Sequence, residues 1–581
     1  MSEETMPASK NRAAMDITHL GLPNRHVDVD GLLTARNSVD FTTVFVDPKS
    51  QRAGGLDAHD RTPRTGEDAD MIIYVQIEIG NIFHQRRIPS IDQDHQQDNI
   101  SPLIETPSFD FILTLMRRGL RNHFRHRHDG DGRLTGTMWT ATAHVITAVI
   151  GSGVLSLAWA ISQMGWIAGP LVLLAFGGIT YYTSVMLADS YRFPHPETGK
   201  RNPTYMAAVK ASLGSREVKA CGILQYMSLF GTCVGYTITT SHSLEAIFRA
   251  GCYHAEGHDA ECKTSLSYYM LGFGATELIF SQIPNFDKMS WLSIVAAVMS
   301  ISYSGIGLGL GIAKAAEHGP RGTLGGLDIG RGPGEVALIE KLLSVANALG
   351  NMAFAYSFST ILITIQDTLK SSPPENKIMK KATLIGITTT TLFYISVGCA
   401  GYAAFGNEAP GDLLTDFGFY EPWWLVDFAN ACLVVHLIGA YQVFAQPVFA
   451  FVEGWITKRR PDSHFIHKNF DLVLPWGSTY HLNLFRLTWR SGYVAVTTLL
   501  AILLPFFNAI MGLLGAIGFW PLTIYFPIQM YKKQAAINFG SKKWYMLNAV
   551  SAICLLVTLA AAVASIQSII QKSKEYKPFS S

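Results

Sequence analysis

The sequence is poor in charged residues. Only 15% of its 581 residues are Asp, Glu, Lys or Arg, and 48% are hydrophobic, whereas soluble proteins average roughly 25% charged residues. The formal net charge is +2 and the basic residues are dispersed over loops, so nothing indicates a nucleic-acid partner. From residue 138 onward, apolar runs of about 20 residues, the length of a membrane-spanning helix, repeat to the end of the chain. We therefore interpret the chain as a polytopic membrane protein.

The common motifs of catalysis and metal binding are missing. The sequence contains no Walker loop, no nucleophile elbow, no HExxH and no paired CxxC. An ATP-driven pump or an intramembrane enzyme therefore has little support. We expect no enzymatic activity, no metal and no cofactor.

The first 130 residues lack apolar runs of more than a few residues and are rich in Asp, Arg, His, Gln and Pro. No apolar stretch follows a basic N-terminus, so we predict no secretory signal peptide. Residues 71–83 could form a strand or hairpin, and residues 109–128 a basic amphipathic helix that serves as a regulatory tail or membrane-surface anchor. The alternative is a disordered extension or a wrongly assigned start codon. Because this composition cannot bury a core, we expect 1–130 to be a disordered cytosolic extension and 131–581 to be the membrane domain.

Eleven apolar ranges of the membrane domain are predicted to span the bilayer. They are 138–162, 166–188, 218–248, 266–284, 289–313, 337–368, 379–404, 423–453, 485–507, 510–530 and 544–570. The sixth and eighth are too long for one straight crossing, so each must tilt, break or project beyond the bilayer. Lys and Arg concentrate in alternate loops, namely 189–217, 285–288, 369–378, 454–484 and 531–543. By the positive-inside rule these loops are cytosolic, so we expect a cytosolic N-terminus and an extracellular C-terminus.

Cysteine is scarce, with seven residues in the whole chain. Five of them fall inside predicted spans, where we expect small apolar packing residues: Cys221, Cys233, Cys399, Cys432 and Cys554. Cys252 and Cys262 share one short loop that is predicted to be extracellular, where an oxidising exterior allows a disulfide. A zinc site that also uses His254 and His258 is the alternative. We expect the disulfide.

The first span contains residues that break helices. Gly151, Ser152 and Gly153 lie near the middle of "TATAHVITAVIGSGVLSLAWA" (140–160). Backbone groups freed within hydrocarbon cost several kcal/mol each, so a break persists only where it lines a cavity or where a ligand replaces the lost partners. A half-helix that starts near Gly153 would point free N–H groups and its positive dipole end at that cavity, which suits a carboxylate. The alternative is a small-residue packing face of the GxxxG kind.

A second interruption is predicted five spans later. Gly350 and Asn351 weaken the sixth span, and the small-aromatic run 353–357, "AFAYS", follows at mid-depth. Interruptions in spans one and six are typical of an inverted five-plus-five repeat with its substrate site at the pseudo-two-fold axis. In such a site a half-helix N-terminus binds a carboxylate and unwound carbonyls bind an ammonium group. The geometry suits a zwitterion.

Long stretches of the membrane domain carry a family resemblance. They read "AHVITAVIGSGVLSLAWAISQMGW", "SQIPNFDKMSWLSIVAAVMS", "GNMAFAYSFSTILITIQDTLKSSPPENKIMKKA", "GYAAFGNEAPGDLLTDFGFYEPWWLVDFANACLVVHLIGAYQVFAQPVFAFVE" and "LPFFNAIMGLLGAIGFWPLTIYFPIQMY". In this order, from about residue 134 to the C-terminus, they closely resemble the plant amino acid permeases of the amino acid/auxin permease superfamily. The resemblance implies an all-α integral membrane protein with a LeuT-like five-plus-five inverted repeat, an eleventh helix and discontinuous helices 1 and 6. It also implies proton-coupled import of usually neutral and acidic amino acids across the plasma membrane. The long N-terminal extension departs from the family, whose members usually have a shorter cytosolic tail.

The same architecture nominates residues for substrate binding. Backbone N–H groups of the first break, with the Ser152 hydroxyl, are expected to bind the substrate carboxylate: Ile150, Gly151, Ser152 and Gly153. Carbonyls and side chains of the sixth span are expected to contact the ammonium group and the side chain of the substrate: Ala353, Phe354 and Tyr356. Spans three and eight should complete the pocket with Tyr226, Gly231, Tyr236 and Asn430. Any polar residue among these could instead form an interhelical hydrogen bond.

Ionisable side chains within apolar spans are candidates for proton coupling, because a charge at the bilayer centre costs about 2.5–3.5 kcal/mol on insertion scales. The main candidates are His144 and His436, since an unperturbed histidine pKa of about 6.5 suits an acidic exterior. The alternative for either is a neutral histidine that is hydrogen-bonded to a neighbouring span. Lesser candidates are Glu245, Glu277 and Asp427, whereas Asp367 is expected to cap a helix or pair with loop lysines. The eighth span, "DFANACLVVHLIGAYQVFAQPVF", offers no Ser or Thr for a sodium site of the LeuT type, so we expect H⁺ to be the coupling ion.

We therefore expect a proton/amino acid symporter of the plasma membrane that works by alternating access. Its expected partners are an amino acid, a proton and the lipid bilayer. One alternative is an auxin or lysine/histidine-type importer of the same superfamily. Another is an amino acid sensor that binds without transporting and uses residues 1–130 as its signalling arm.

Overall fold

The computed structural model describes residues 136–579, with gaps at 258–259, 261, 284–289, 331–335, 416–418, 420 and 474–478. The chain divides into two units, Met1–Ser101 and Pro102–Ser581, and all described residues belong to the second. The predictions for residues 1–130 and for His258 lie outside the described residues.

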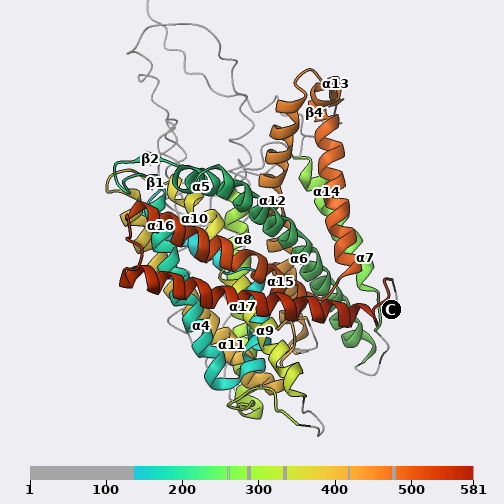
Figure 1. Cartoon of the computed structure of the whole chain (residues 1–581). Coiled ribbons are helices and arrows are strands. Elements are labelled where there is room, and N and C mark those ends of the chain that lie inside the picture. The colour runs from blue at the N-terminus through green and yellow to red at the C-terminus, as the bar shows by residue number, and fades with distance from the viewer. Residues whose placement is uncertain are drawn as a thin grey trace, which may run out of the picture. The chain divides into compact units, whose positions relative to one another are not determined.

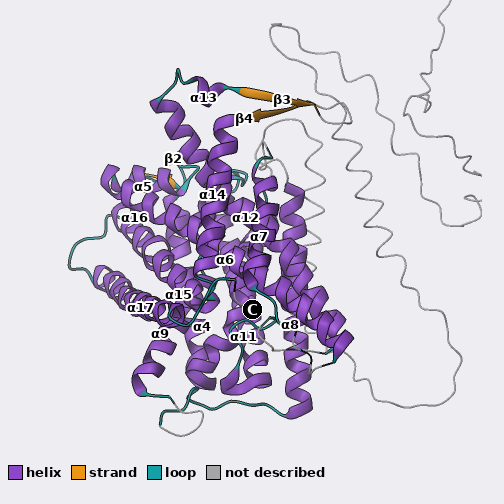
Figure 2. Ribbon diagram, turned by 90° about the vertical axis from the view of Figure 1, so that its right-hand side faces the viewer, coloured by secondary structure: helices purple, strands orange, loops and turns teal. Residues whose placement is uncertain are grey.

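The described part of the membrane domain is almost entirely helical (Figures 1 and 2). Its long helical segments are α3 (Met138–Val149), η5 (Ser152–Ser156), α4 (Leu157–Ser190), α6 (Ser215–Glu256), α7 (Leu266–Ser281), α8 (Ser290–His318), α9 (Leu338–Ala355), α10 (Ser359–Asp367), α11 (Glu375–Phe405), α12 (Trp423–Arg459), α14 (Leu484–Leu503), α15 (Phe507–Gly518), η8 (Phe519–Tyr525), α16 (Phe526–Gln534) and α17 (Lys542–Ser573). Short elements connect them: α5 (Tyr205–Leu213), η7 (Gly406–Glu408) and α13 (His464–His467). The described strands form two antiparallel hairpins, β1 (Arg192–Phe193) with β2 (Lys200–Arg201) and β3 (Asn469–Val473) with β4 (Thr479–Asn483).

Each predicted span falls on one of these helical segments or on two or three consecutive ones. Seven described helical segments are long and apolar enough to cross a membrane. They are Ser152–Ser190, Val295–His318, Leu338–Asp367, Glu375–Glu408, Trp423–Arg459, Phe507–Gln534 and Lys542–Ser573. The other four predicted spans coincide with α3, α6, α7 and α14, which are helical but too short or too polar to join that group.

Local chemistry explains where these helices begin and end. The Thr137 side chain caps α3 by accepting a hydrogen bond from the Thr140 backbone N–H at 3.3 Å. Within α4, Gly165 has a φ of +80°, which turns the chain sharply between the first and second predicted spans. Helix α14 ends at Leu503, earlier than the predicted 507, because Pro505 has no backbone N–H to continue it.

The two overlong predicted ranges behave differently. Range 337–368 breaks into α9 and α10. Range 423–453 is part of α12, which stays helical over 37 residues and extends beside α14 toward α13 and the β3–β4 hairpin (Figure 1). One overlong range therefore breaks and the other projects.

Helix packing explains why the sixth span breaks where it does. Helix α9 packs closely against α15, and a Cβ added at Gly350 would lie 2.6 Å from the Gly512 carbonyl oxygen. The Asn351 side-chain amide donates to the Asn508 carbonyl of α15 at 2.9 Å. Gly350 and Asn351, predicted to weaken the helix, thus join two helices inside a continuous α9. The break lies further along, at residues 356–358.

Candidate functional site

The predicted break in the first span is confirmed. Helix α3 ends at Val149, Ile150 and Gly151 leave the helical conformation, and η5 begins at Ser152. The first N–H groups of a helix have no acceptor within that helix, so those of η5 are available to a ligand. Among the described residues, the buried Ser152 hydroxyl has no hydrogen-bond partner either. This half-helix start is therefore a set of unused hydrogen-bonding groups.

The second break joins α9 to α10 through Tyr356, Ser357 and Phe358. Local turns satisfy part of its backbone, because the Ser357 N–H donates to the Phe354 carbonyl and the Phe358 N–H donates to the Tyr356 carbonyl, both at 3.0 Å. The Ser357 hydroxyl donates to the Ala353 carbonyl at 2.8 Å. The connection is thus a compact turn in the middle of a membrane-spanning segment.

The two breaks touch each other. A Cβ added at Gly153 would lie 3.0 Å from the Ala355 Cα, so any larger residue would force the two breaks slightly apart. The Tyr394 hydroxyl of α11 contacts the carbonyls of Val149 and, at 3.2 Å, Ala355, which are the last residues of α3 and α9. One side chain thus links the C-terminal ends of both interrupted helices. Sequence reasoning did not single out Tyr394.

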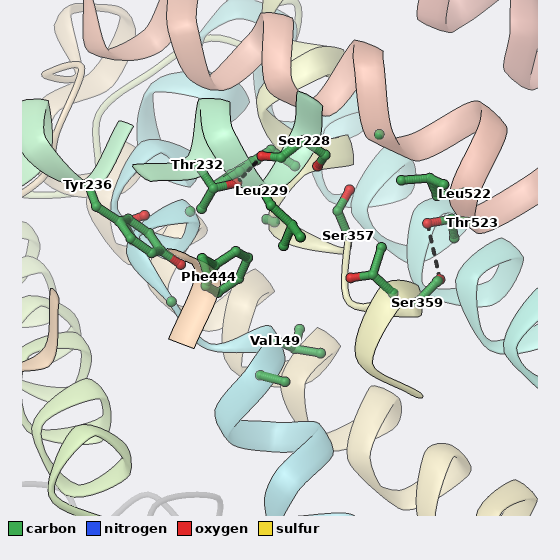
Figure 3. A pocket seen from close by; sticks show the side chains of 18 residues that line it. Val149, Ser228, Leu229, Thr232, Tyr236, Ser357, Ser359, Phe444, Leu522 and Thr523 are labelled. Atoms are coloured by element: carbon green, nitrogen blue, oxygen red, sulfur yellow. Dashed lines mark hydrogen bonds between the residues drawn. The ribbon is translucent and has the colours of Figure 1, made fainter. Parts of the chain in front are cut away.

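A cavity of about 50 Å³ lies where the breaks meet (Figure 3). It is lined by Ala148, Val149, Gly151, Ser152, Gly153, Ser228, Leu229, Thr232, Tyr236, Phe354, Ala355, Ser357, Ser359, Thr360, Phe444, Gly518, Leu522 and Thr523. Five nominated residues are among them: Gly151, Ser152, Gly153, Tyr236 and Phe354. A Cβ added at Gly151 would meet no atom within 4 Å, so this glycine faces open space.

The other nominated residues of the two breaks lie outside the cavity lining. Ile150 and Ala353 are buried in the surrounding core. The Tyr356 side chain is fully buried, and its hydroxyl donates to Thr391 Oγ1 of α11 at 3.0 Å. These three residues pack within the core beside the breaks and do not face the cavity.

The nominated residues Tyr226, Gly231 and Asn430 do not line the cavity. The Tyr226 ring stacks on Phe451, with centroids 4.3 Å apart. A side chain at Gly231 would collide with Leu514 of α15. The Asn430 amide donates to the carbonyls of Leu414, at 3.3 Å, and Val426, at 3.1 Å. All three have packing or interhelical contacts instead.

Sequence reasoning missed most of the hydroxyl-bearing side chains of the cavity. Ser228 and Thr232 precede the nominated Tyr236 at intervals of four residues on α6, so a helical-face argument could have found them. Thr523 belongs to the π-helical segment η8, and the Ser359 hydroxyl donates to it at 3.1 Å. Such π-helical turns often occur at functional sites, but their position is not visible in apolar periodicity.

The two candidate histidines lie outside the cavity lining. His144 is exposed on α3. His436 is buried, and its Nδ1 lies 2.8 Å from the Ala296 carbonyl of α8. A carbonyl only accepts hydrogen bonds, so Nδ1 carries the proton and His436 fastens α12 to α8. Its geometry matches the alternative of an interhelical hydrogen bond.

The lesser acidic candidates have varied surroundings. Glu245 lies 4.0 Å from Arg249 of the same helix, and Asp427 is half-buried at the start of α12. Asp367 accepts a hydrogen bond from the Tyr191 hydroxyl at 2.5 Å, so its recorded partner is a tyrosine instead of a loop lysine. Glu277 is completely buried on α7.

A disulfide joins Cys252, near the end of α6, to Cys262 in the connection to α7, with Cα atoms 6.0 Å apart, so one of the two cysteines predicted in a loop is helical. The neighbouring His254 ring stacks on Trp423, with centroids 4.4 Å apart. In the described part of the chain, this histidine is therefore engaged with an aromatic ring.

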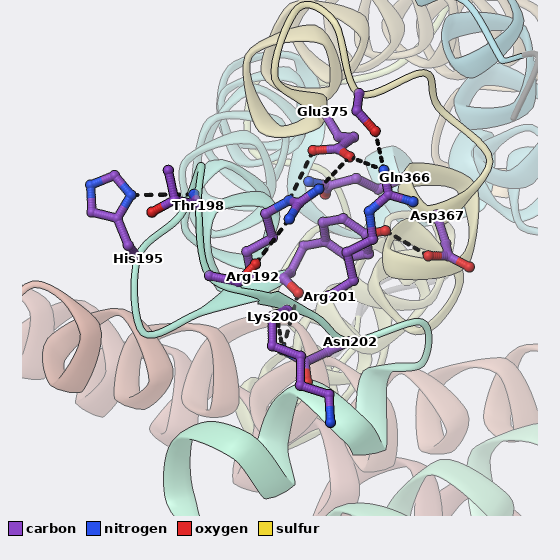
Figure 4. A network of polar contacts seen from close by, with 12 residues as sticks. Arg192, His195, Thr198, Lys200, Arg201, Asn202, Gln366, Asp367 and Glu375 are labelled. Carbon is purple, nitrogen blue, oxygen red and sulfur yellow. Dashed lines mark hydrogen bonds and ion pairs between the residues drawn. The ribbon is translucent and has the colours of Figure 1, made fainter.

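A polar network lies beside the end of α10 and the start of α11 (Figure 4). Gly136, just before α3, exchanges backbone hydrogen bonds with Thr368 and Lys370, just after α10. Beside them, Glu375 accepts from Arg192 at 2.8 Å and from Arg201 at 2.6 Å. The hydrogen bond from Arg192 to Glu375 raises the pKa of that guanidinium. Two backbone hydrogen bonds thus hold the start of α3 against the end of α10, and beside them ion pairs hold the β1–β2 hairpin against the start of α11.

Comparison with known proteins identifies the family. Residues 134–571 match the family described as "Transmembrane amino acid transporter protein". The chain is 56% identical over 456 residues to Amino acid permease 8 of Arabidopsis thaliana, covering 78% of this chain and 94% of that protein. It is 29% identical over 446 residues to Lysine histidine transporter-like 1 of Arabidopsis thaliana, covering 76% of this chain and 90% of that protein. The crystal structure of MhsT in complex with L-phenylalanine matches with a TM-score of 0.43 at 10% identity, covering 73% of this chain and 98% of that one. The chain therefore belongs to the amino acid permeases of the transmembrane amino acid transporter family, which makes it a multi-pass membrane transporter of amino acids and not an enzyme.

Proposed function

We propose that the chain is a proton-coupled symporter that imports neutral and, secondarily, acidic amino acids across the plasma membrane by alternating access. The observation that carries this proposal is the cavity between the two helix breaks, where the Ser152 hydroxyl and the first N–H groups of η5 have no recorded protein partner. These groups are donors at the positive end of a helix, so they suit the carboxylate of an amino acid.

Other hydroxyl groups of the cavity lining suit the ammonium group. Hydroxyl protons of Thr232, Ser357 and Ser359 are already donated to the Ser228 carbonyl, the Ala353 carbonyl and Thr523 Oγ1, respectively. Each hydroxyl oxygen keeps lone pairs that can accept from a cation. Figure 3 shows these side chains around one space, with Tyr236 and Phe444 on one side of it. The first N–H groups of η5 supply donors and these hydroxyl oxygens supply acceptors, and a zwitterion needs both.

The lining also bears on the choice of side chain. None of the residues that line the cavity is charged. A lysine or arginine side chain would find no countercharge there, and burying it unpaired would be costly. We infer a preference for neutral amino acids, with small ones fitting the volume directly and larger ones requiring movement of Tyr236, Phe354 or Phe444.

Alternating access requires the start of α3 and the end of α10 to separate at some stage. The bonds from Gly136 to Thr368 and Lys370 hold the start of α3 against the end of α10. We propose that this end faces the cytosol, as the charge of the loops predicts, and that these contacts separate when the substrate is released inward. The extracellular side would then carry the Cys252–Cys262 disulfide.

A lysine/histidine-type importer is the weaker alternative. Identity to Lysine histidine transporter-like 1 is 29%, against 56% to Amino acid permease 8. The uncharged cavity points the same way. For the coupling ion, the absence of Ser and Thr from residues 427–449 of α12 favours H⁺ over sodium.

Voltage-clamp recordings from oocytes that express the full chain test the proposal. Single amino acids are applied at about pH 5 and about pH 7.5, with sodium replaced by choline. The panel includes lysine, histidine and an auxin. Sodium-independent inward currents that grow with acidity and favour neutral amino acids are expected. A current that disappears without sodium would contradict the choice of ion, and binding without current at confirmed surface expression would favour the sensor.

A further inference from the structure

Glu277 is a buried acidic side chain that forms no ion pair among the described residues. It lies on α7, is 0% exposed, and is enclosed by α6, α12 and α14, which pack against α7. Its Oε2 accepts a hydrogen bond from the Gln442 side-chain amide at 2.7 Å. Its Oε1 is buried and, among the described residues, has no hydrogen-bond partner. One neutral donor is thus the only recorded partner of this carboxyl group in the described part of the chain.

The groups around Glu277 do not supply a countercharge. Cys233 of α6 and Tyr441 of α12 are close enough to Glu277 to interact with it electrostatically, and the Cys233 thiol donates to the Tyr441 carbonyl at 3.8 Å. The Tyr441 hydroxyl pairs with Thr497 of α14 at 2.7 Å. Arg490 of α14 is the cation of this region, but its Nε is paired with Glu453 at 2.8 Å. In the described structure no Lys, Arg or His forms an ion pair with Glu277.

This environment determines the protonation state of the carboxyl group. Desolvating a carboxylate without a countercharge costs several kcal/mol, whereas the neutral acid carries an O–H and avoids most of that cost. Glu277 is therefore stable in this conformation as the neutral acid. To lose its proton, the side chain needs a conformation in which water or a cation reaches it.

A polar path leads from Glu277 to the end of the molecule that bears the β3–β4 hairpin. Gln442 Nε2 also contacts the Ser281 hydroxyl at 2.9 Å, and Arg490 Nη1 donates to the Ser281 carbonyl at 2.8 Å. Glu453, paired with Arg490, is also bound at 3.1 Å by Arg486, whose side chain is more than half exposed. These contacts connect the buried acid with groups at the surface.

Two of the helices that enclose Glu277 also line the candidate substrate site. Thr232 and Tyr236 line the cavity on α6, and Cys233 lies between them in the chain. Phe444 lines the cavity on α12, two residues beyond Gln442. Movements of α6 and α12 that accompany substrate binding therefore reach the surroundings of Glu277 directly.

We propose that Glu277 is the residue that binds the cotransported proton. An O–H bond forms at its carboxyl group while the transporter faces outward, and the same bond breaks when the inward-facing state admits water along the Gln442–Ser281–Arg490 path. The proton comes from external hydronium and passes to cytosolic water, so one O–H bond of hydronium breaks at uptake and one forms at release. This inference rests on the proposed function, because it requires that transport is coupled to H⁺.

Purified full-length protein in liposomes tests this role through two activities. Glu277→Gln imitates the neutral acid but has no proton to release. We expect it to exchange external for internal amino acid, yet to lose accumulation driven by an inside-alkaline pH gradient. Glu317→Gln is the control, because Glu317 is an exposed glutamate at the end of α8 that belongs to neither the cavity nor the polar path. It should keep both activities.

The outcomes separate the two proposals. If the wild type itself shows no accumulation driven by a pH gradient, the proposed symport fails. If the wild type accumulates and Glu277→Gln does so equally, only the role of Glu277 is overturned. Should Glu277→Gln lack exchange as well, Glu277→Asp decides. A shifted pH midpoint of uptake supports the proton-binding role, and an unchanged profile refutes it.

Discussion

Two buried glutamates of this transporter have opposite surroundings. Glu375, at the start of α11, has a side chain that is 2% exposed and accepts hydrogen bonds from two arginines (Figure 4). Glu277, near the end of α7, is equally inaccessible but, among the described residues, has one amide donor and an oxygen without a hydrogen-bond partner. The first carboxyl group is stabilised as an anion, whereas the second is stable as a neutral acid.

The difference separates polar groups that hold the structure together from polar groups that await a ligand. Around Glu375 the charges pair within the protein and fix the β1–β2 hairpin against α11. Around the cavity, Ser152 Oγ and the first N–H groups of η5 have no protein partner among the described residues, and we propose that they bind the substrate carboxylate. In the same way, Glu277 Oε1 is proposed to bind the proton. Changes in the first region should therefore reduce stability, and changes in the second should reduce transport or binding.

The largest effect is expected at Glu375. Glu375→Gln removes a charge from two arginines and should lower the free energy of unfolding by about 3 kcal/mol, the low end for a broken buried ion pair, since Arg201 is partly exposed. Glu277→Gln keeps a hydrogen-bonding group of the same size and should cost less than about 1 kcal/mol. Thermal unfolding of the purified variants in detergent measures both. Equal losses of stability would remove the distinction between the two glutamates.

The contact between the two breaks can be probed with a pair of glycines. Gly153→Ala places a Cβ against Ala355 and should cost about 1–3 kcal/mol of overpacking, with severe loss of transport. Gly151→Ala points into open space, so it should fold normally and weaken substrate binding instead. Surface expression and uptake kinetics distinguish the two effects. Similar behaviour of both variants would argue against the packing described for Gly153.

Tyr394 is a paired polar group inside the transport region. Tyr394→Phe removes the hydroxyl that joins the ends of α3 and α9 and should cost about 1 kcal/mol of stability. Because it loosens the two breaks relative to each other, it should also slow transport. Thermal unfolding and uptake assays together check this. Unchanged stability and uptake would mean that the link has no role.

Ser152→Ala should have the smallest effect on stability. The Ser152 hydroxyl has no recorded partner in the described structure, so its removal should leave the unfolding temperature unchanged. It should raise the half-saturation concentration of substrate by an amount equivalent to about 0.5–1.5 kcal/mol, the value of one hydrogen bond. Uptake measured over a range of amino acid concentrations gives this number. An unaltered half-saturation value would place the carboxylate elsewhere.

The sequence predicted the features that depend on local composition. Apolar runs located the membrane helices. The Gly151–Gly153 triplet located the first break because its residues are poor helix formers. The second break, at residues 356–358, overlaps the predicted run 353–357, whereas Gly350 stays inside α9 because its contact with Gly512 of α15 is made only in the folded molecule. Local patterns cannot distinguish a glycine that packs from one that breaks a helix.

The site itself was predicted only in part for the same reason. Thr523 comes from a distant π-helical segment that no periodicity announces. The bond of His436 to the Ala296 carbonyl, which matches the interhelical alternative, joins two helices that are far apart in the sequence. Glu277 gained its interest from burial and the absence of a recorded ion-pair partner among the described residues, both of which are properties of the tertiary structure.

The central claim is that amino acid and proton move together through this protein. The most direct test follows the internal pH of liposomes that contain the purified transporter and a pH-sensitive dye, with no sodium on either side. Adding a neutral amino acid outside should acidify the interior while the labelled amino acid enters. Entry of the amino acid without acidification, or only after sodium is added, would contradict the account.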